Sequence, residues 1–324
     1  RMEMAMSHVA VTGANGFVGR TVVRTLLARG HEVTAIVRRS AGETGGVRQC
    51  VVGEAGAAAW PPGLKPDAVI HLAARVHVMR ENASDSLAAF REANVIGALR
   101  VAEAAHRAGV RRLVFVSSIK ALAETDGGRP LREDDPPQPQ DPYGVSKLEA
   151  ERALVRFGEE SGLEVVIARP PLVYGPEVRA NFLQLMSVIA KGLPLPLGAI
   201  TARRSLVYNE NLADALILCA TDPRAAGECF HITDGADLTV AELAKVLGRH
   251  LHKHVWLAPV TANWMLAAGK LTGRSAQVER LVEPLRVDSS RIREKLQWQP
   301  RFSVDEGLAQ TAQWYRSTQR GRAS

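Results

Sequence analysis

The sequence contains little cysteine and no long apolar run, and each absence excludes a class of protein. Its 324 residues include three cysteines, Cys50, Cys219 and Cys229, an odd number without metal-ligand spacing. The longest apolar runs, such as 215–220, are far shorter than the roughly 18 residues typical of a membrane span. Residues 1–7 lack the apolar region of a signal peptide. We therefore expect reduced thiols and a cytoplasmic protein that does not span a membrane.

Basic blocks are also lacking, although 41 lysines and arginines against 34 acidic residues give a net charge of +7. The positive charge is spread thinly, and no basic strand is interleaved with the aromatic side chains that stack on bases. These absences argue against nucleic-acid binding. A basic cleft for an anionic small molecule, such as a dinucleotide or a nucleotide sugar, explains the excess equally well.

Strand-like and helix-like stretches alternate through the first half of the chain, a pattern typical of a parallel sheet with helices on both faces. The expected strands are 8–11, 32–37, 49–52, 67–72, 112–117 and 163–169, and the clearest helices are 82–108 and 143–161. The sequence therefore predicts an α/β fold, with a Rossmann-type doubly wound sheet over residues 1–170. A smaller, mostly helical substrate domain would follow over 171–324, with part of 205–234 returning to the sheet.

Three glycines follow the first expected strand and open the first expected helix. Gly13, Gly16 and Gly19 are spaced GxxGxxG, not the GxGxxG of many dehydrogenases. Gly13 permits a tight turn, Gly16 lets the backbone approach a pyrophosphate at the helix N-terminus, and Gly19 allows helix and strand to pack closely. The strand–turn–helix context favours a dinucleotide site over a chance glycine turn.

A tyrosine and a lysine stand four residues apart at the start of a later helix. Tyr143 and Lys147 would share one helix face, about 6 Å apart, and an ammonium beside a phenol lowers the pKa of the phenol. Tyr143 could then act as a general acid or base near neutral pH. Ser117 and Ser118 come at the end of a strand, where a hydroxyl can face the ligand crevice. Alone, these residues could equally be an exposed helix start and ordinary strand-end serines.

Together the motifs resemble the extended short-chain dehydrogenase/reductase family, specifically its branch of nucleotide-sugar epimerases, dehydratases and reductases. The resemblance covers nearly the whole chain, and its motifs follow the family's order. They lie at 11–19, 67–74, 94–97, 115–118, 143–147, 169–171, 174–176, 204–208 and 296–300. Ser118 precedes Tyr143 by 25 residues, which is the spacing of the corresponding hydroxyl in UDP-galactose 4-epimerases.

The resemblance implies a role for each matching residue. Ser118 would orient the reacting oxygen, Tyr143 would exchange a proton with the sugar, and Lys147 would hold the nicotinamide ribose and lower the pKa of Tyr143. Besides Tyr143 and Lys147, the residues implied at the cofactor are Gly13, Asn15, Gly16, Phe17, Val18, Gly19, Arg38, Glu54, Leu72, Ala73, Ala74, Asn94 and Pro170. Those implied at the nucleotide sugar are Val78, Ser118, Asn181, Leu195, Leu197, Arg204 and Leu285. Among these, Arg204 would pair with the diphosphate, and Leu195 and Leu197 would cover the uracil.

Several positions depart from the patterns of related branches. Arg38, followed by Arg39, ends the second strand, where many NAD-preferring members carry an acid, so NADP is slightly favoured over NAD. Ile119 and Lys120 stand where sugar 4,6-dehydratases carry an Asp-Glu pair, which argues against dehydration. Leu285 stands where 4-epimerases with a large tyrosine exclude N-acetyl groups, and its smaller side chain leaves room for one.

These features favour an NAD(P)-dependent oxidoreductase of surface-polysaccharide biosynthesis that reduces a UDP-4-keto-6-deoxy-N-acetylhexosamine at C4. The alternative is a UDP-N-acetylglucosamine/UDP-glucose 4-epimerase, because both activities use the same residues. A non-catalytic dinucleotide-binding sensor or scaffold is a further alternative, against which the intact Ser118, Tyr143 and Lys147 argue. No metal ligand is expected, and the family resemblance implies a homodimer.

Overall fold

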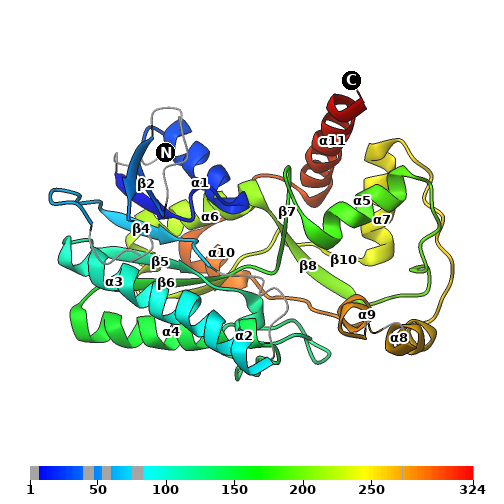
Figure 1. Ribbon diagram of the computed structural model, residues 1–324, viewed down its shortest axis with the longest axis horizontal. Helices are drawn as coiled ribbons and strands as arrows, with labels where there is room; N and C mark the ends of the chain where they lie inside the picture. Colours follow the sequence, from blue (N-terminus) through cyan, green and yellow to red (C-terminus); the bar gives the residue numbers. More distant parts are fainter. Residues whose placement is uncertain are drawn as a thin grey trace.

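The computed structural model describes residues 7–38, 47–52, 60–74, 83–271, 273 and 275–323 (Figure 1). The strands are β1 His8–Thr12, β2 Glu32–Val37, β3 Arg48–Val51, β4 Ala68–His71, β5 Arg112–Val116, β6 Glu164–Arg169, β7 Leu172–Tyr174, β8 Arg203–Tyr208, β9 Cys229–His231 and β10 Asp237–Thr239. The α-helices are α1 Phe17–Ala28, α2 Ala83–Phe90, α3 Gly97–Arg107, α4 Pro142–Ser161, α5 Ala180–Ala190, α6 Asn209–Thr221, α7 Val240–Leu251, α8 Ala262–Leu271, α9 Ser275–Val282, α10 Ser290–Leu296 and α11 Val304–Ala323. A π-helical segment η2 (Arg91–Ile96) joins α2 to α3, and 3-10 turns form η3 (Ile119–Ala121) and η4 (Pro223–Ala225).

Seven strands form the large sheet in the order β3-β2-β1-β4-β5-β6-β9. Every neighbouring pair is parallel, so the carboxyl ends of all seven strands lie along one edge. The chain builds outward from β1 in one direction and then, from β4, in the other. Ligands of such sheets bind at this reversal point, beyond the carboxyl ends of the strands. The prediction of a Rossmann-type α/β fold is confirmed.

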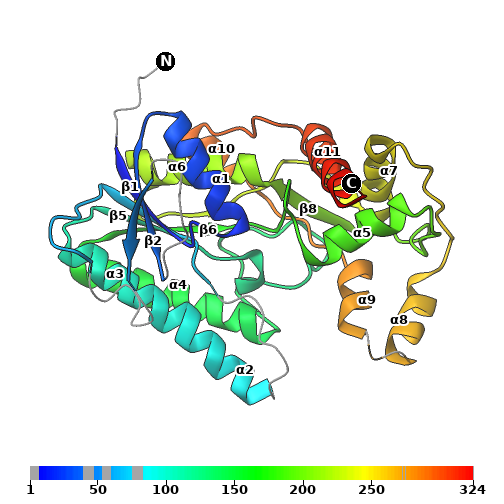
Figure 2. The same ribbon diagram turned by 45° about the horizontal axis from the view of Figure 1, so that its top comes forward.

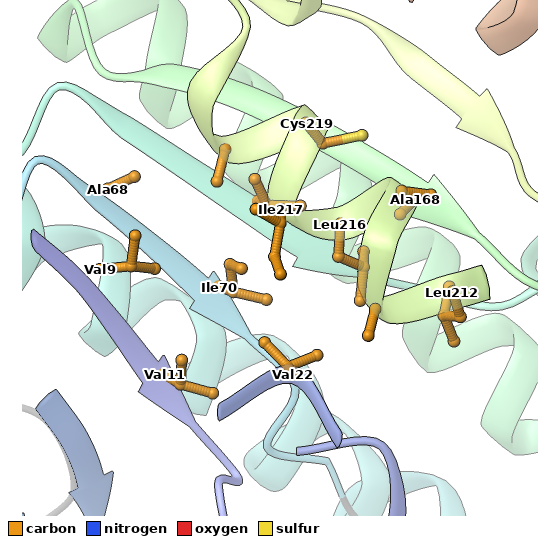
Figure 3. Packing of buried hydrophobic residues seen from close by; sticks show 14 of the residues in the cluster. Val9, Val11, Val22, Ala68, Ile70, Ala168, Leu212, Leu216, Ile217 and Cys219 are labelled. Carbon is orange, nitrogen blue, oxygen red and sulfur yellow. The ribbon is translucent and has the colours of Figure 1, made fainter. Parts of the chain in front are cut away.

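Helices cover both faces of this sheet because its strands are apolar on both sides. The α1 and α6 helices lie on one face, and α3 and α4 lie on the other (Figure 1). Figure 3 shows Leu216 and Ile217 of α6 on the side of the helix that faces Ile70 of β4, and all three side chains are fully buried. The strands of the large sheet are therefore held in place by helices on both faces, and so are the loops at their carboxyl ends.

A second, smaller unit contains the antiparallel pair β10 and β8, with β7 added parallel to β8. Its core is apolar and includes Phe182 and Met186 of α5, Leu247 of α7 and Leu308 of α11. Figure 2 shows α8 and α9 side by side in this unit. The sequence predicts this part to be mostly helical with a strand-like stretch at 205–208, which lies within β8, whereas β7, β10 and their pairing with β8 are findings that the pattern did not reveal.

The chain passes more than once between the two units. After β6 it leaves the large sheet to form β7, α5 and β8, and it then returns through α6 to the parallel pairing of β9 with β6. Separately, within the described ranges, no helix has the length and apolar content needed to cross a membrane.

Candidate active site

The loop between β1 and α1 is built around its three glycines. Gly13 has a φ of +69°, and a Cβ there would lie 2.8 Å from the Ala73 amide nitrogen. A Cβ on Gly19 would lie 2.1 Å from the carbonyl oxygen of Gly13, closer than any real side chain approaches. The Gly16 amide donates to that same carbonyl at 2.9 Å, and Gly16 itself is exposed. Turn, close packing and an open backbone at the helix start therefore occur together, as a pyrophosphate site requires.

The other residues of this loop connect the two units. Asn15 is exposed at the loop's outer side. Phe17 begins α1 and packs against the core of the smaller unit, whereas Val18 packs against the core of the large sheet. The loop is therefore positioned by both cores.

The end of β4 lies next to this loop. Ala73 donates its amide to Thr12 Oγ1 at 3.2 Å, and Thr12 Oγ1 lies 2.6 Å from His71 Nδ1. His71 is 3% exposed, and burial together with the charge of Lys147 lowers its pKa to about 3. It is therefore uncharged at neutral pH. Leu72 is half-buried, and Ala73 and Ala74 are exposed where the strand ends.

Ser118 lies at the carboxyl end of β5, between that strand and the short turn η3. Its backbone is extended, and its Oγ accepts from the Lys120 amide at 3.2 Å. The next amide, that of Ile119, donates to the carbonyl of Pro170 at 3.0 Å, just beyond the end of β6. Ser118 is thus held by two adjacent strand ends of the sheet.

Tyr143 and Lys147 enter the site from the first turns of α4. Asp141 caps this helix by accepting from the Gly144 amide at 2.6 Å. Tyr143 is hydrogen-bonded to Ser118, and its ring meets Phe90 edge to face at a centroid distance of 5.9 Å. Lys147 is 2% exposed and donates from Nζ to the Val116 carbonyl at 2.9 Å. The structure therefore brings the serine, tyrosine and lysine together at one strand end.

The expected lowering of the tyrosine pKa is absent. Burial raises the pKa of Tyr143 to about 12, the charge of Asp141 raises it too, and the hydrogen bond with Ser118 only partly opposes them. Burial lowers the pKa of Lys147 to about 8, although Glu151 acts in the opposite direction. Lys147 Nζ lies 4.6 Å from the centroid of the Phe115 ring and 5.9 Å from that of Tyr143. The ammonium therefore faces the strand and Phe115 more closely than the phenol.

Asn94 supports the start of α4 from the π-helical segment η2. It is 1% exposed and donates from Nδ2 to Ser146 Oγ at 3.0 Å. Ser146 Oγ in turn donates to the Tyr143 carbonyl at 2.8 Å. Asn94 is therefore linked through Ser146 to the main chain of the tyrosine and contributes to its position.

Sequence reasoning missed a buried ion pair behind the lysine. Glu151 and Arg169 are 4% and 8% exposed, and their side chains meet at 2.6 Å, with Arg169 Nε also donating to Glu151. A signal was present in the sequence, since Tyr143, Lys147 and Glu151 follow one another at i, i+4 and i+8 on one helix face. Within the described segments, no group of three or more His, Cys, Asp or Glu side chains is arranged to hold a metal ion.

The residues expected at the nucleotide sugar fall into different surroundings. Asn181 is exposed in the first turn of α5. Arg204 is half-buried and donates to the Glu283 carbonyl at 2.8 Å. Leu195 and Leu197 are 7% and 5% exposed within the core of the smaller unit. Their side chains pack in that core, and the expectation that this segment covers the uracil stays a prediction.

Leu285 lies closer to the turn after Ser118 than its distance in sequence suggests. It is 5% exposed and packs in an apolar cluster with Ile119 and Leu122, directly after Ser118. Arg38 is exposed immediately after β2. Glu54 and Val78 lie outside the described residues.

Comparison with known proteins gives a consistent result. A sequence model of the NAD-dependent epimerase/dehydratase family matches residues 9–233. A UDP-glucose 4-epimerase of Vibrio cholerae is 41% identical over 94% of both chains, and one of Mycolicibacterium smegmatis is 29% identical over 95% of this chain and 98% of that one. The crystal structure of UDP-glucose 4-epimerase from Thermotoga maritima with UDP-glucose superposes with a TM-score of 0.75 at 25% identity, covering 96% of this chain and 99% of that one.

Proposed function

Because this chain belongs to the NAD-dependent epimerase/dehydratase family, an enzyme family of nucleotide sugars, we propose that it inverts C4 of a UDP-hexose. The likeness to the Vibrio cholerae 4-epimerase, which extends along nearly all of both chains, carries this proposal. The meeting of Ser118, Tyr143 and Lys147 at one strand end supports it from the geometry. We therefore prefer the 4-epimerase to the reductase that the sequence analysis favours.

The residues present fit a dinucleotide cofactor. A side chain on Gly13 or Gly19 would collide with backbone atoms, so the loop is specialised for close approach. Two buried polar atoms at the strand ends, Ser117 Oγ and His71 Nε2, have no hydrogen-bond partner among the described residues. Bound NAD would supply hydride transfer at C4 of the sugar, and Gly13, Gly16 and Lys147 are the residues that we propose to hold it.

The side chains of this site would manage the proton and the reacting oxygen. Tyr143 would take the proton from the C4 hydroxyl as the 4-keto sugar forms. It would return the proton to the same oxygen when the hydride comes back to the opposite face of C4, with Ser118 hydrogen-bonded to that oxygen. The raised pKa of Tyr143 suits an acid more than a base. A cation close to the phenol is therefore required in the working complex, and the Lys147 ammonium is the nearest built into the helix.

Dehydration is disfavoured by the residues that follow Ser118. Sugar 4,6-dehydratases are expected to need an acid and a base at this point, whereas Ile119 is buried and Lys120 is paired with Asp141 and Glu124. Neither side chain can remove the proton that dehydration requires. We therefore propose epimerisation over dehydration.

The test is to incubate the purified protein with UDP-glucose and, separately, with UDP-N-acetylglucosamine, without added cofactor. Epimerisation has no net redox change, so a cofactor retained through purification should support conversion to the 4-epimer, followed by NMR of the sugar. A Tyr143→Phe preparation with the same cofactor content is the control. No conversion of either sugar by a cofactor-loaded wild-type protein would overturn the proposal.

A reductase of a UDP-4-keto-6-deoxy sugar in surface-polysaccharide biosynthesis remains the second candidate, favoured by Arg38. This exposed guanidinium at the end of β2 would attract the 2′-phosphate of NADP, the pool that cells keep reduced. Stoichiometric oxidation of added NADPH by the keto sugar, with no epimerisation in the first test, would establish this activity instead. Arg38→Ala should then reduce the preference for NADPH over NADH.

A further inference from the structure

We propose that Lys120 is a positioning residue of the reaction, which ties the turn carrying Ser118 to the helix carrying Tyr143 through Asp141. This inference rests on the proposed function, since it concerns the same serine and tyrosine. Lys120 itself is not placed at the reacting atoms. It acts by fixing the relative position of two groups that do meet them, and by setting the charge beside one of them.

The contacts of Lys120 span the two elements. Its backbone amide donates to Ser118 Oγ at 3.2 Å, while its Nζ donates to Asp141 Oδ2 at 2.5 Å and to Glu124 Oε1 at 3.0 Å. The other oxygen of Asp141 accepts from the Gly144 amide and so caps α4. One residue therefore contacts the serine by its main chain and the helix cap of the tyrosine by its side chain.

The two elements are also in close backbone contact at this point. A Cβ on Gly144 would lie 2.4 Å from the Lys120 carbonyl oxygen, so the first turn of α4 lies directly on the main chain of η3. Lys120 and Asp141 have side chains that are 25% and 26% exposed. The ion pair thus closes a junction that is already tight, in a partly desolvated place where it is less screened than a surface pair.

The charges of Lys120 and Asp141 act on the pKa of Tyr143. Asp141 raises the pKa of Tyr143. Burial acts to raise the pKa of Asp141 itself, but hydrogen bonds from Lys120 and the Gly144 amide hold it below its usual range. Asp141 is therefore a carboxylate, and Lys120 is the cation that offsets its field at the phenol.

Other charged groups face the junction from each packed element. Glu124 comes from the segment after η3 and shares the Lys120 ammonium, and Lys147 lies one turn further along α4. On the side of η2, Arg91 is paired with Glu149 of α4 at 2.6 Å, so that pair brings little net charge. Removing Lys120 consequently leaves Asp141, the carboxylate that raises the pKa of Tyr143, without its cation.

The experiment compares Lys120→Met, Lys120→Arg and Asp141→Asn in pH profiles of kcat for the epimerisation. An ionised Tyr143 is needed for proton removal, so kcat should rise with pH as the phenol ionises. Lys120→Met should shift this rising limb of the pH profile to higher pH and lower kcat at neutral pH about threefold to tenfold. Asp141→Asn should move the limb to lower pH, because it removes the nearest negative charge while asparagine still caps the helix. Lys120→Arg should restore the wild-type profile.

Lys295→Met is the matched control, because Lys295 also pairs with a carboxylate, Glu228, but joins α10 to the start of β9 rather than η3 to α4. It should leave the profile unchanged. If Lys120→Met and Asp141→Asn lower kcat equally at every pH, or shift the limb in the same direction, Lys120 is only a structural residue and the proposal fails.

A second measurement separates this proposal from the proposed function. The chain has four tyrosines, so carbon-13 labelling and a Tyr143→Phe variant assign the ring signal of Tyr143 by NMR. At a fixed alkaline pH, the ionised fraction should fall in the order Asp141→Asn, wild type, Lys120→Met. This order requires no turnover. Its absence would overturn the role of Lys120 even in an active epimerase, and its presence would support that role even if UDP-hexoses prove not to be substrates.

Discussion

Tyr143 is the side chain on which the proposed chemistry depends most directly. Replacing it with phenylalanine keeps the ring against Phe90 but removes the transferable proton. We predict that kcat falls by about 10²–10⁴-fold, whereas the cofactor content and the unfolding temperature stay close to those of the wild type. Enzyme assays on matched preparations check this, and a variant with wild-type turnover would contradict the assignment.

We predict that the buried ammonium of Lys147 lowers the free energy of unfolding at neutral pH. Its pKa is about 8 in the fold against 10.5 in the unfolded chain, a penalty of about 3 kcal/mol below both values. The unfolded chain binds more protons between these two pH values, so this penalty fades as the pH rises from about 8 to about 10.5. Lys147→Met should therefore raise the free energy of unfolding near pH 7 by about 2 kcal/mol, after the loss of the bond to Val116.

Urea unfolding at several pH values measures this effect. The advantage of Lys147→Met should shrink toward pH 10.5, and the exposed Lys191 offers a control, since Lys191→Met should show no such trend. A methionine variant that is less stable than the wild type at neutral pH would show that the buried ammonium is fully compensated.

Individual residues differ in how far the sequence revealed their roles. The spacing of Tyr143 and Lys147 predicts that they share a helix face, because helix periodicity is local. The direction of the tyrosine's pKa shift was predicted wrongly, because burial and the carboxylate of Asp141 depend on the folded surroundings. The packing of Leu195 and Leu197 in the core of the smaller unit likewise depends on folded surroundings that the sequence does not show.

The turn from β1 into α1 offers a prediction for a whole element. A methyl group on Gly19 would overlap the Gly13 carbonyl, which is backbone and cannot move aside. Gly19→Ala should therefore destabilise the fold by about 1–3 kcal/mol and abolish retention of the dinucleotide. Gly97→Ala is the control, since its nearest contact would be an ordinary 3.7 Å to the Glu92 carbonyl, and it should leave cofactor retention unchanged.

Helices and strands were predictable from the sequence where the apolar pattern extends over many residues. The limits of β2 match the expected range, and α4 differs by one residue at its start. The expected helix 82–108 is interrupted by the π-helical segment around Asn94, which apolar periodicity does not reveal. β7 and β10 have three residues each, too short to show alternation, and they form because β8 lies between them.

For the whole molecule, Asp234 is the residue that joins the units. Its carboxylate accepts from Tyr174 of β7 at 2.8 Å, from the Tyr208 amide at 2.9 Å and from Asn211 of α6 at 2.8 Å. Asp234→Ala removes the shared acceptor of three buried donors, of which Tyr174 and Asn211 keep bonds to the Val304 and Phe302 carbonyls, and it should lower the free energy of unfolding by about 2–3 kcal/mol. Urea denaturation checks this, with Asp305→Ala, in an exposed pair with Arg249, expected to be close to neutral. A loss no larger than that of the control would show that water replaces the carboxylate.

The position of β9 at the outer edge of the large sheet also matters while the chain is being made. Roughly 60 residues separate the end of β6 from the start of β9, and synthesis at about 5–20 residues per second delivers them in roughly 3–12 s. Through that interval β6 is an open edge, with apolar residues such as Val166 and Ala168 that are fully buried in the finished fold. On the ribosome this protein therefore exposes an unpaired apolar strand for seconds, and slower translation of residues 170–228 should increase both its aggregation and its demand for chaperones.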